Sequence, residues 1–407
     1  MLAWGGMIIS RPLRILISAG EASGDRLGAD LVRALRNRVP ALELRGMGGR
    51  HLLDEGLIPV AHARDISVVG LAEVLGGIRR ILRARRRLLH LAEHWSPHIA
   101  ILVDCPDFNH SLAKAFKQRG IYVIQLVAPQ VWAWRPGRIH RFAAALDLLI
   151  VLFEFEVAIW RPTGIQVEWL GHPVRDRLVS LSRRRPSSHG GGRRKDAGEQ
   201  NPPTIVLMPG SRPAEVKRIL PHMIDTIARL RARLPDVACF VACAPGLDRR
   251  WVRKLCRGED ISIHAEEGAA SLVHADAALI ASGTATLEAA LLACPAVIVY
   301  RLNRLSYWLA KLLLRRLRWI GLPNILLDKS VYKEYIQKIN IPEVADALQE
   351  VMSSEAKRAA LRADAEKLRL LLGAPGVMER LADVIVPLAT RRLKNTEGAD
   401  NADNISS

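Results

Sequence analysis

Short continuous apolar runs recur along the chain, separated by segments whose apolar residues fall at helical spacing. In the first half these runs are Leu13–Ser18, Ile99–Val103, Ile121–Leu126 and Leu146–Leu152, and an amphipathic pattern near Arg26–Arg38 follows the first. Strands buried on both faces of a parallel sheet read as apolar runs of this kind. Helices between parallel strands imply right-handed crossovers, so the pattern predicts a doubly wound α/β domain.

The same alternation restarts in the second half, with runs at Thr204–Met208, Ala238–Ala242, Ala277–Ala281 and Ala296–Tyr300. A chain of 407 residues is too long for one hydrophobic core. We therefore expect an α/β protein of two Rossmann-like, doubly wound domains that face each other across a cleft. Ligands of such sheets bind beyond the carboxyl ends of the strands.

Composition divides the chain into five segments. Residues 1–182 form the N-terminal domain and residues 204–350 the C-terminal domain. Between them, residues 183–203 are basic and rich in Gly and Pro, which is typical of a disordered linker or insertion. Residues 351–392 read as helices that could pack back on the N-terminal domain, and residues 393–407 as a disordered polar tail.

The net charge of +18 indicates an anionic partner. Two basic amphipathic stretches, at residues 68–87 and 302–319, are typical of helices that lie in a membrane interface. The alternative is that each helix packs on its own domain or on a second subunit, which leaves a homo-oligomer open. No nucleic-acid-binding motif accompanies the charge, so we expect no nucleic-acid partner.

The five cysteines show no Cys-x-x-Cys spacing, which argues against a zinc site or a disulfide framework and favours a reducing cytosol. No stretch approaches the roughly 18 apolar residues that cross a bilayer, and no signal peptide is convincing. We expect a cytoplasmic protein that can lie on a membrane surface without crossing it.

Phosphate-binding chemistry is clearest in the second domain. The segment from Ser282 to Glu288 follows a predicted strand and opens a helix. Its small residues let a diphosphate approach the helix N-terminus, where the hydroxyls of Ser282, Thr284 and Thr286 can donate to it. Glu288, one turn on, can accept hydrogen bonds from ribose hydroxyls. An ordinary capped helix explains these residues about equally well.

A second strand-to-helix junction in this domain, Pro209-Gly210-Ser211-Arg212, offers a guanidinium fork that matches phosphate oxygens. In the first domain, the segment Asp104-Cys105-Pro106-Asp107-Phe108-Asn109 stands at the end of a predicted strand. A carboxylate there can act as general base on a sugar hydroxyl. Asp107 fits the role of a helix N-cap better, which leaves Asp104 as the catalytic candidate.

Two tryptophans and an arginine, Trp132, Trp134 and Arg135, follow another predicted strand. Indole rings can form a wall for a sugar or an acyl chain, although plain core packing explains them too. His172 lies near the expected domain junction, and a lone histidine is more often structural than catalytic.

Together these segments resemble the lipid-A-disaccharide synthase family. The matching motifs occur in family order and span nearly the whole chain outside the predicted linker and tail: AGEASGD (19–25), VVGLAEVLG (68–76), DCPDFN (104–109), APQVWAWR (128–135), GHPVRD (171–176), LMPGSRPAEV (207–216), ASGTATLEAAL (281–291), PAVIVYR (295–301) and LPNILL (322–327). Cys105 stands where the family usually has Ser or Ala, and Asp328 where Gly is common.

The resemblance implies a GT-B fold and an inverting, metal-independent transfer. It also implies a protein peripherally associated with the cytoplasmic face of the inner membrane, with no metal and no cofactor. UDP-2,3-diacylglucosamine and 2,3-diacylglucosamine 1-phosphate would give the β-1,6-linked lipid A disaccharide 1-phosphate and UDP, with Asp104 as the base. The implied donor site comprises Gly210, Ser211, Arg212, Ser282, Gly283, Thr284, Ala285, Glu288 and Asn324. The implied acceptor site comprises Gly20, Glu21, Ser23, Asp107, Asn109, Trp132, Trp134 and Arg135. A non-hydrolysing UDP-N-acetylglucosamine 2-epimerase, which shares the architecture, is the alternative.

Overall fold

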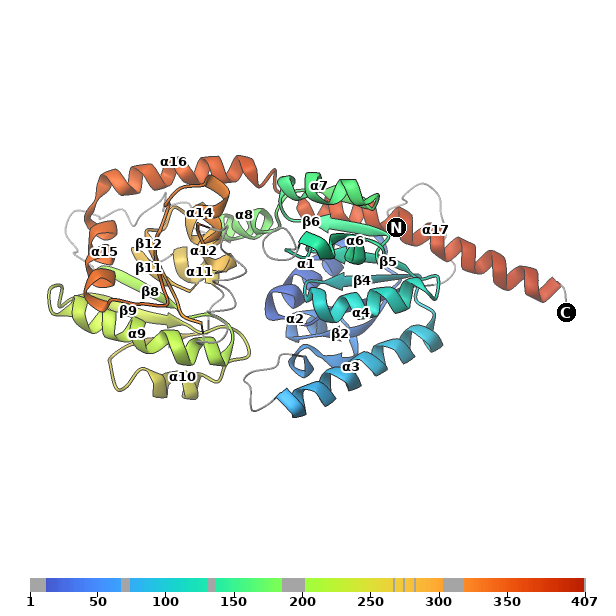
Figure 1. The fold of residues 1–407 in the computed structure, drawn as a ribbon, viewed down its shortest axis with the longest axis horizontal. Helices are drawn as coiled ribbons and strands as arrows, with labels where there is room; N and C mark the ends of the chain where they lie inside the picture. Colours follow the sequence, from blue (N-terminus) through green and yellow to red (C-terminus); the bar gives the residue numbers. More distant parts are fainter. Residues whose placement is uncertain are drawn as a thin grey trace. The chain divides into compact units, whose positions relative to one another are not determined.

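The computed structural model describes residues 12–66, 74–130, 136–184, 202–265, 268–273, 275–281, 283–302 and 318–405. The chain divides into an N-terminal unit, residues 1–176 with 374–407, and a C-terminal unit, residues 177–373 (Figure 1). The division falls within helix α8 (Val174–Arg184), six residues before the predicted domain end at 182. Helix α8 also includes the first two residues of the predicted linker. Residues 185–201 of that linker lie outside the described residues.

A seven-stranded parallel sheet forms the centre of the N-terminal unit, in the order β3-β2-β1-β4-β5-β6-β7. This is the Rossmann order, whose topological switch point lies between β1 and β4. The apolar runs predicted as strands are confirmed as β1, β4, β5 and β6. The strands are β1 (Leu13–Ala19), β2 (Leu42–Gly48), β3 (Ile58–His62), β4 (Ile99–Val103), β5 (Tyr122–Leu126), β6 (Leu148–Val151) and β7 (Gln166–Trp169).

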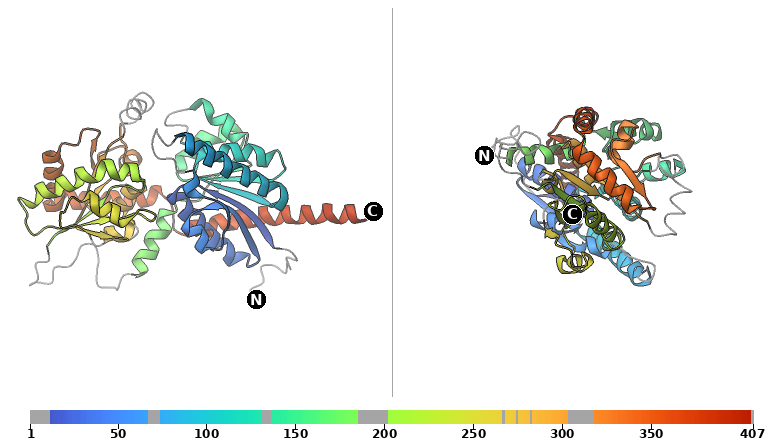
Figure 2. Two further views of the ribbon diagram at one scale, coloured as in Figure 1. Left: turned by 90° about the horizontal axis from the view of Figure 1, so that it is seen from below. Right: turned by 90° about the vertical axis from the view of Figure 1, so that its left-hand side faces the viewer.

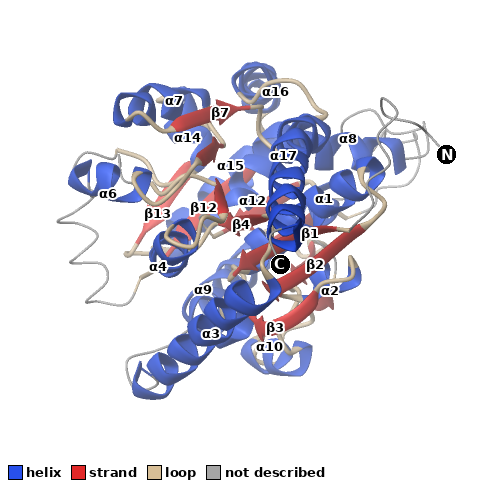
Figure 3. Ribbon diagram, turned by 90° about the vertical axis from the view of Figure 1, so that its right-hand side faces the viewer, coloured by secondary structure: helices blue, strands red, loops and turns tan. Residues whose placement is uncertain are grey.

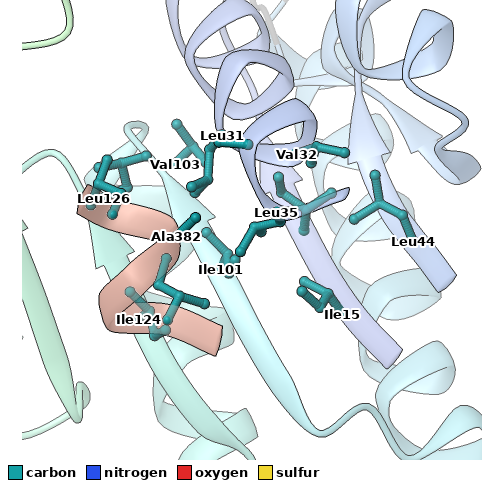
Figure 4. Close-up of a cluster of buried hydrophobic side chains, with 14 of the residues drawn as sticks. Ile15, Leu31, Val32, Leu35, Leu44, Ile101, Val103, Ile124, Leu126 and Ala382 are labelled. Atoms are coloured by element: carbon teal, nitrogen blue, oxygen red, sulfur yellow. The ribbon is translucent and has the colours of Figure 1, made fainter. Parts of the chain in front are cut away.

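Alternating side chains of this sheet enter two hydrophobic cores. Ile15 and Ile101 pack against helix α1 (Ala22–Arg38) and helix α17 (Val377–Ile405) on one face (Figure 4). Leu16 and Leu102 face helix α3 (Val74–Trp95) and helix α4 (Pro106–Lys117) on the other. Figure 2 shows the two helical layers on either side of the strands. Smaller helices complete the unit: α2 (Arg50–Asp54), α6 (Ile139–Ala143) and α7 (Glu154–Trp160).

The C-terminal unit repeats the plan with six parallel strands in the order β10-β9-β8-β11-β12-β13. Its core packs Ile205 and Leu207 of β8 against helices α9 (Pro213–Arg231) and α15 (Ile341–Ser353). Figure 3 distinguishes strands from helices. The strands are β8 (Thr204–Met208), β9 (Ala238–Ala242), β10 (Ser262–His264), β11 (Ala277–Ile280), β12 (Ala296–Tyr300) and β13 (Lys333–Ile336). The remaining helices include α10 (Arg249–Leu255), α11 (Gly268–Val273), α12 (Thr284–Leu291), α14 (Leu322–Leu327) and α16 (Glu355–Leu371).

The C-terminal helices belong to different units. Helix α16 packs on α12 and α14 of the C-terminal unit, whereas α17 packs on α1 of the N-terminal unit. The predicted return of residues 351–392 to the first domain is therefore right for α17 and wrong for α16. Helix α17 is described as far as Ile405, within the stretch 393–407 that the sequence predicts to be disordered.

Helix α3 contains the described part of the first basic stretch. It packs on its own domain along one side and leaves a basic side exposed. Its carboxyl-terminal half buries Ala84, Leu88 and Trp95 on its own sheet, while Ile78 and Leu82 are each 47% exposed. The exposed side of the described part also carries Arg79, Arg80, Arg83, Arg86 and Arg87. Residues 67–73 of this stretch, and nearly all of the second stretch (303–317), lie outside the described residues. No described helix has the length and hydropathy needed to cross a membrane.

Candidate functional site

Asp104 lies at the carboxyl end of β4, beside the switch point of the N-terminal sheet, and is partly exposed. Its φ is +51°, and that of Cys105 is +45°. Val127, after the neighbouring strand β5, has a φ of +76°. Left-handed backbone is costly for residues with a Cβ, most of all for a β-branched one, and such strain tends to gather at functional sites.

A buried polar network holds this strained turn. The Asp104 carbonyl accepts hydrogen bonds from Asn109 Nδ2 at 2.6 Å and from Gln125 Nε2 at 3.3 Å. Asn109 Oδ1 accepts from the hydroxyl of Ser18 at 2.8 Å. The side chain of Asn109 has no exposed surface, so in this structure it cannot touch an acceptor. Its predicted acceptor contact is corrected to a contact with the backbone of Asp104.

Asp107 is not the N-cap of α4, contrary to the expectation from sequence. The N-cap is Cys105, and Asp107 lies in the first helical turn, exposed, with its carboxylate 2.7 Å from the guanidinium of Arg138. The left-handed backbone of Asp104 and Cys105 starts the helix two residues earlier than an N-cap at Asp107 would. Asp107 therefore remains open to solvent, as the acceptor-site prediction requires.

The AGEASGD motif after β1 contains both buried residues and exposed residues. Helix α1 starts at Ala22, four residues before the predicted start, with Glu21 as N-cap and Ser23 exposed. Gly20 is buried, and a Cβ built there would lie 2.8 Å from the sulfur of Cys105. Asp25 is buried and accepts hydrogen bonds from the backbone N–H groups of Gly49, His51 and Leu52, so it holds α2.

The first turn of α1 also lies against the catalytic candidate. A Cβ built on Gly24 would be 3.5 Å from the Cβ of Asp104. The positive end of the α1 dipole is thus placed beside this residue. Gly20, Cys105 and Asp104 therefore lie together at the carboxyl ends of β1 and β4, whereas Trp132, Trp134 and Arg135 lie outside the described residues.

In the C-terminal unit, the junction after β8 is stabilised by a carboxylate that the sequence analysis missed. Glu215, in the first turn of α9, accepts hydrogen bonds from the Tyr300 hydroxyl and from the backbone N–H groups of Ser211 and Arg212. Gly210 has a φ of +106°, and a Cβ there would lie 2.3 Å from the Glu215 carboxylate. The available signal was a Glu three residues after the N-cap, because a Glu at this position can accept from the N–H group of the N-cap residue.

Burial sets the protonation of this pair. It raises the pKa of Glu215, partly opposed by the nearby Arg212 guanidinium. Burial and the Glu215 carboxylate raise the pKa of Tyr300 to about 12. Glu215 thus accepts from the N–H groups of Ser211 and Arg212, while the side chains of these two residues are exposed.

The junction after β11 is more open. Gly283 has a φ of +130° and, with Thr284, is exposed at the start of α12, while Ala285 is half-buried. Thr286 is buried, and its hydroxyl donates to the carbonyl of Gly283 at 2.8 Å, so the predicted phosphate contact from Thr286 is wrong. Ser282 lies outside the described residues.

Glu288, one turn into α12, is 7% exposed, and its carboxylate lies 3.8 Å from the guanidinium of Arg177. A Cβ built on Gly268 would lie 3.3 Å from the same carboxylate. This glycine leaves space against Glu288 at the carboxyl ends of the central strands, where a Rossmann sheet binds its ligand. Sequence reasoning did not find Arg177, because it follows the GHPVRD motif by one residue and carries no pattern of its own.

Asn324 is the second asparagine whose predicted role the structure corrects. Its side chain has no exposed surface. Asn324 Nδ2 donates to the Tyr332 carbonyl at 2.7 Å and to Glu334 Oε1 at 2.8 Å, and Asn324 Oδ1 accepts from the Tyr332 N–H at 2.9 Å. These bonds join α14 to β13, so Asn324 acts in the framework and does not reach the donor.

Two further sequence expectations concern histidine and metals. His172 is buried, and its Nδ1 accepts from the Val174 N–H at 3.1 Å at the start of α8, a structural contact. Within the described ranges, no three His, Cys, Asp or Glu side chains are grouped as a metal site would require.

The comparisons with known proteins agree with this architecture. The glycosyltransferase SnogD from Streptomyces nogalater superposes with a TM-score of 0.53 at 16% identity, covering 93% of this chain and all of that one. UDP-GlcNAc 2-epimerase from Neisseria meningitidis, bound to UDP-GlcNAc, gives a TM-score of 0.59 at 11% identity over 92% of this chain and 99% of its own. The two Rossmann-type units are those of the GT-B glycosyltransferase fold.

Sequence relationships identify the family. The family model of lipid-A-disaccharide synthetase matches residues 15–383. Lipid-A-disaccharide synthase of Myxococcus xanthus (strain DK1622) is 37% identical over 383 residues, which are 93% of this chain and 98% of the relative. The chain therefore belongs to the lipid-A-disaccharide synthase family of glycosyltransferases, and the epimerase alternative is not favoured.

Proposed function

We propose that this enzyme transfers 2,3-diacylglucosamine from its UDP conjugate to the 6-hydroxyl of 2,3-diacylglucosamine 1-phosphate, with Asp104 as the general base. The acceptor O–H bond breaks and its proton passes to Asp104, while the oxygen bonds to the anomeric carbon from the face opposite UDP. The bond from that carbon to the diphosphate breaks, and UDP leaves. The configuration therefore inverts through an oxocarbenium-like transition state.

The observation that carries this proposal is the position of Asp104. It is a partly exposed carboxylate at the carboxyl end of β4, at the switch point where ligands of such sheets bind, in a chain of this family. Gly20, Glu21, Ser23 and Asp107 lie on the loops and helix starts around the same edge and would bind the acceptor.

The C-terminal unit would hold the UDP portion of the donor. Its open α12 N-terminus, with Gly283, Thr284 and Ala285, suits a diphosphate, and the exposed Arg212 adds a cation. Fixed positive groups at this place stabilise the charge that develops on the leaving UDP. Glu288 would accept hydrogen bonds from the ribose hydroxyls.

The decisive experiment measures UDP release from the diacylglucosamine donor with and without the acylated acceptor. We expect release only when the acceptor is present. Asp104→Asn should lower kcat at least about 100-fold, because the acceptor hydroxyl loses its base, and should leave UDP affinity within about twofold of the wild type. Near-normal turnover in Asp104→Asn would contradict the assignment of Asp104 as the general base.

We further propose that the outer side of α3 lies on an anionic membrane surface, where acylated substrates reside. Ile78 and Leu82 can enter the acyl boundary while Arg79, Arg83 and Arg86 meet phosphate headgroups. Replacing these three arginines with glutamine should abolish sedimentation with phosphatidylglycerol vesicles at low salt. If the variant sediments with these vesicles as well as the wild type does, the proposed contact between α3 and the membrane is wrong.

A further inference from the structure

The turn that carries Asp104 is held by buried amides that are too deep to touch a substrate. Ser18 and Asn109 have no exposed surface, and Gln125 is 3% exposed. They come from β1, α4 and β5. Asn109 and Gln125 donate to the Asp104 carbonyl, and Ser18 donates to Asn109 Oδ1. Elements α4 and β5 thus meet at one peptide group, and β1 supports this contact through Asn109.

Gln125 serves both strained positions. Its Nε2 lies 3.3 Å from the Asp104 carbonyl, 3.3 Å from the Leu126 carbonyl and 3.1 Å from the Val127 carbonyl. The Asp104 N–H donates in turn to the Leu126 carbonyl at 2.9 Å. The left-handed turns after β4 and β5 are therefore tied to each other as well as to the core.

The orientation of the Asp104–Cys105 peptide decides where the carboxylate points. A residue with a Cβ at φ near +50° gains by rotating its peptides back to right-handed geometry, and that rotation would swing the Cβ of Asp104 away from its present direction. The amides of Asn109 and Gln125 oppose it, because rotation would break one buried hydrogen bond of each amide.

We propose that Asn109 and Gln125 are positioning residues that hold the strained Asp104 turn and thereby aim the general base. This inference rests on the proposed role of Asp104. A base displaced by a fraction of an ångström loses much of its effect on the rate while ground-state binding changes little. The amides should therefore influence kcat more than KM.

Two variants remove the amide donors at nearly constant shape: Gln125→Met and Asn109→Asp. In the full-length enzyme with both acylated substrates, each should lower kcat about 10- to 100-fold, which is the range expected when one buried hydrogen-bond partner is lost at a reacting group. KM for either substrate should change by less than about threefold. If Asn109→Asp does not fold, Gln125→Met alone decides.

A matched control is Asp147, which precedes β6 and contacts the opposite end of β5. Asp147 accepts a hydrogen bond from the Val123 N–H at 2.8 Å, at the amino end of β5. Asp147→Ala should lower the melting temperature at least as much as Gln125→Met does, and should leave kcat unchanged. A kcat that falls in all three variants in step with melting temperature would show a role in folding alone and would overturn the proposal.

A double variant separates this inference from the proposed function. If Gln125 acts through Asp104, then Gln125→Met should not slow the residual rate of Asp104→Asn any further. Additive losses would overturn the positioning role. If Asp104→Asn is inactive but Gln125→Met and Asn109→Asp keep full kcat, the positioning role is refuted and Asp104 remains the proposed base. An active Asp104→Asn would refute the proposed function itself.

Discussion

Individual residues at the carboxyl ends of β4 and β5 carry the strain of the N-terminal unit. Asp104, Cys105 and Val127 each keep a left-handed backbone that costs about 1–3 kcal/mol per residue. Asn109 and Gln125 offset this cost with hydrogen bonds inside the core. The amides of Asn109 and Gln125 therefore determine the backbone conformation of Asp104, and with it the direction of the Asp104 side chain.

Cys105 allows a chemical test of the exposure of this turn. It is the partly exposed member of the five cysteines, whereas burial raises the pKa of both Cys239 and Cys294 to about 12. Since the thiolate is the reactive form, we expect alkylation by iodoacetamide at pH 8 to modify Cys105 first and to abolish activity. Peptide mass spectrometry checks the site. Cys105→Ser should stay active and resist the reagent, and rapid labelling of a buried cysteine would contradict the described burial.

The sequence predicted the chemistry of some of these residues and misread others. Asp104 follows a short, continuous apolar run, so its place at a strand end could be inferred. Asn109 and Asn324 were assigned to ligands, because an asparagine that binds backbone and one that binds substrate look alike in a sequence. Gln125 carried a signal that was not used: it is the one polar residue facing the core inside the run YVIQL.

Elements differ in how far the sequence determines them. The central strands were predicted because both of their faces are buried, which produces continuous apolar runs. The strands β3, β7, β10 and β13 lie at sheet edges and are half exposed, so their sequences lack that signal. Strand β2 was missed for a related reason, since it alternates buried leucines with Glu43 and Arg45.

The loop between β8 and α9 is an element whose stability should depend on pH. Tyr300 donates to Glu215, which holds this loop, and its pKa rises from 10.0 to about 12 in the folded protein. The folded state therefore keeps a proton that the unfolded chain loses, so the stabilisation is complete below pH 10 and declines as the pH rises toward 12.

Urea unfolding of the wild type and of Tyr300→Phe at pH 8, 10 and 11.5 measures this effect. The wild type should exceed the variant by roughly 1–2 kcal/mol at pH 8, allowing for partial solvent screening, and the difference should shrink at pH 11.5. A difference that is constant over this range would mean that Tyr300 titrates alike in both states.

At the scale of the whole molecule, the chain leaves the N-terminal unit after Asp176 and returns to it at Ala374. Hydrogen bonds to Asp176 hold the returning segment. The Asp176 carboxylate accepts from the Gly376 N–H at 2.5 Å and from the Met378 N–H at 3.1 Å. Helix α17 then completes the core with Leu381, Ala382 and Ile385. The C-terminal unit is thus inserted into the sequence of the N-terminal unit.

Removing α17 should unfold one unit and spare the other. A chain that ends after Gly373 loses several buried side chains worth about 1.5–3 kcal/mol each, which is comparable with the whole stability of a domain. Limited proteolysis should degrade residues 12–176 and leave residues 202–373 protected. A chain that ends after Lys394, past the buried Leu393, should resist proteolysis like the wild type. Equal resistance of both truncations would show that α17 is dispensable.

The late return of α17 has a consequence for biosynthesis. A ribosome makes residues 177–373 before it makes the helix on which β1, β4 and β5 depend. The unit that is translated first must therefore wait with an open apolar face until α17 emerges, after the whole of the second unit. A premature stop before the buried Leu393 leaves the earlier-made half unable to mature.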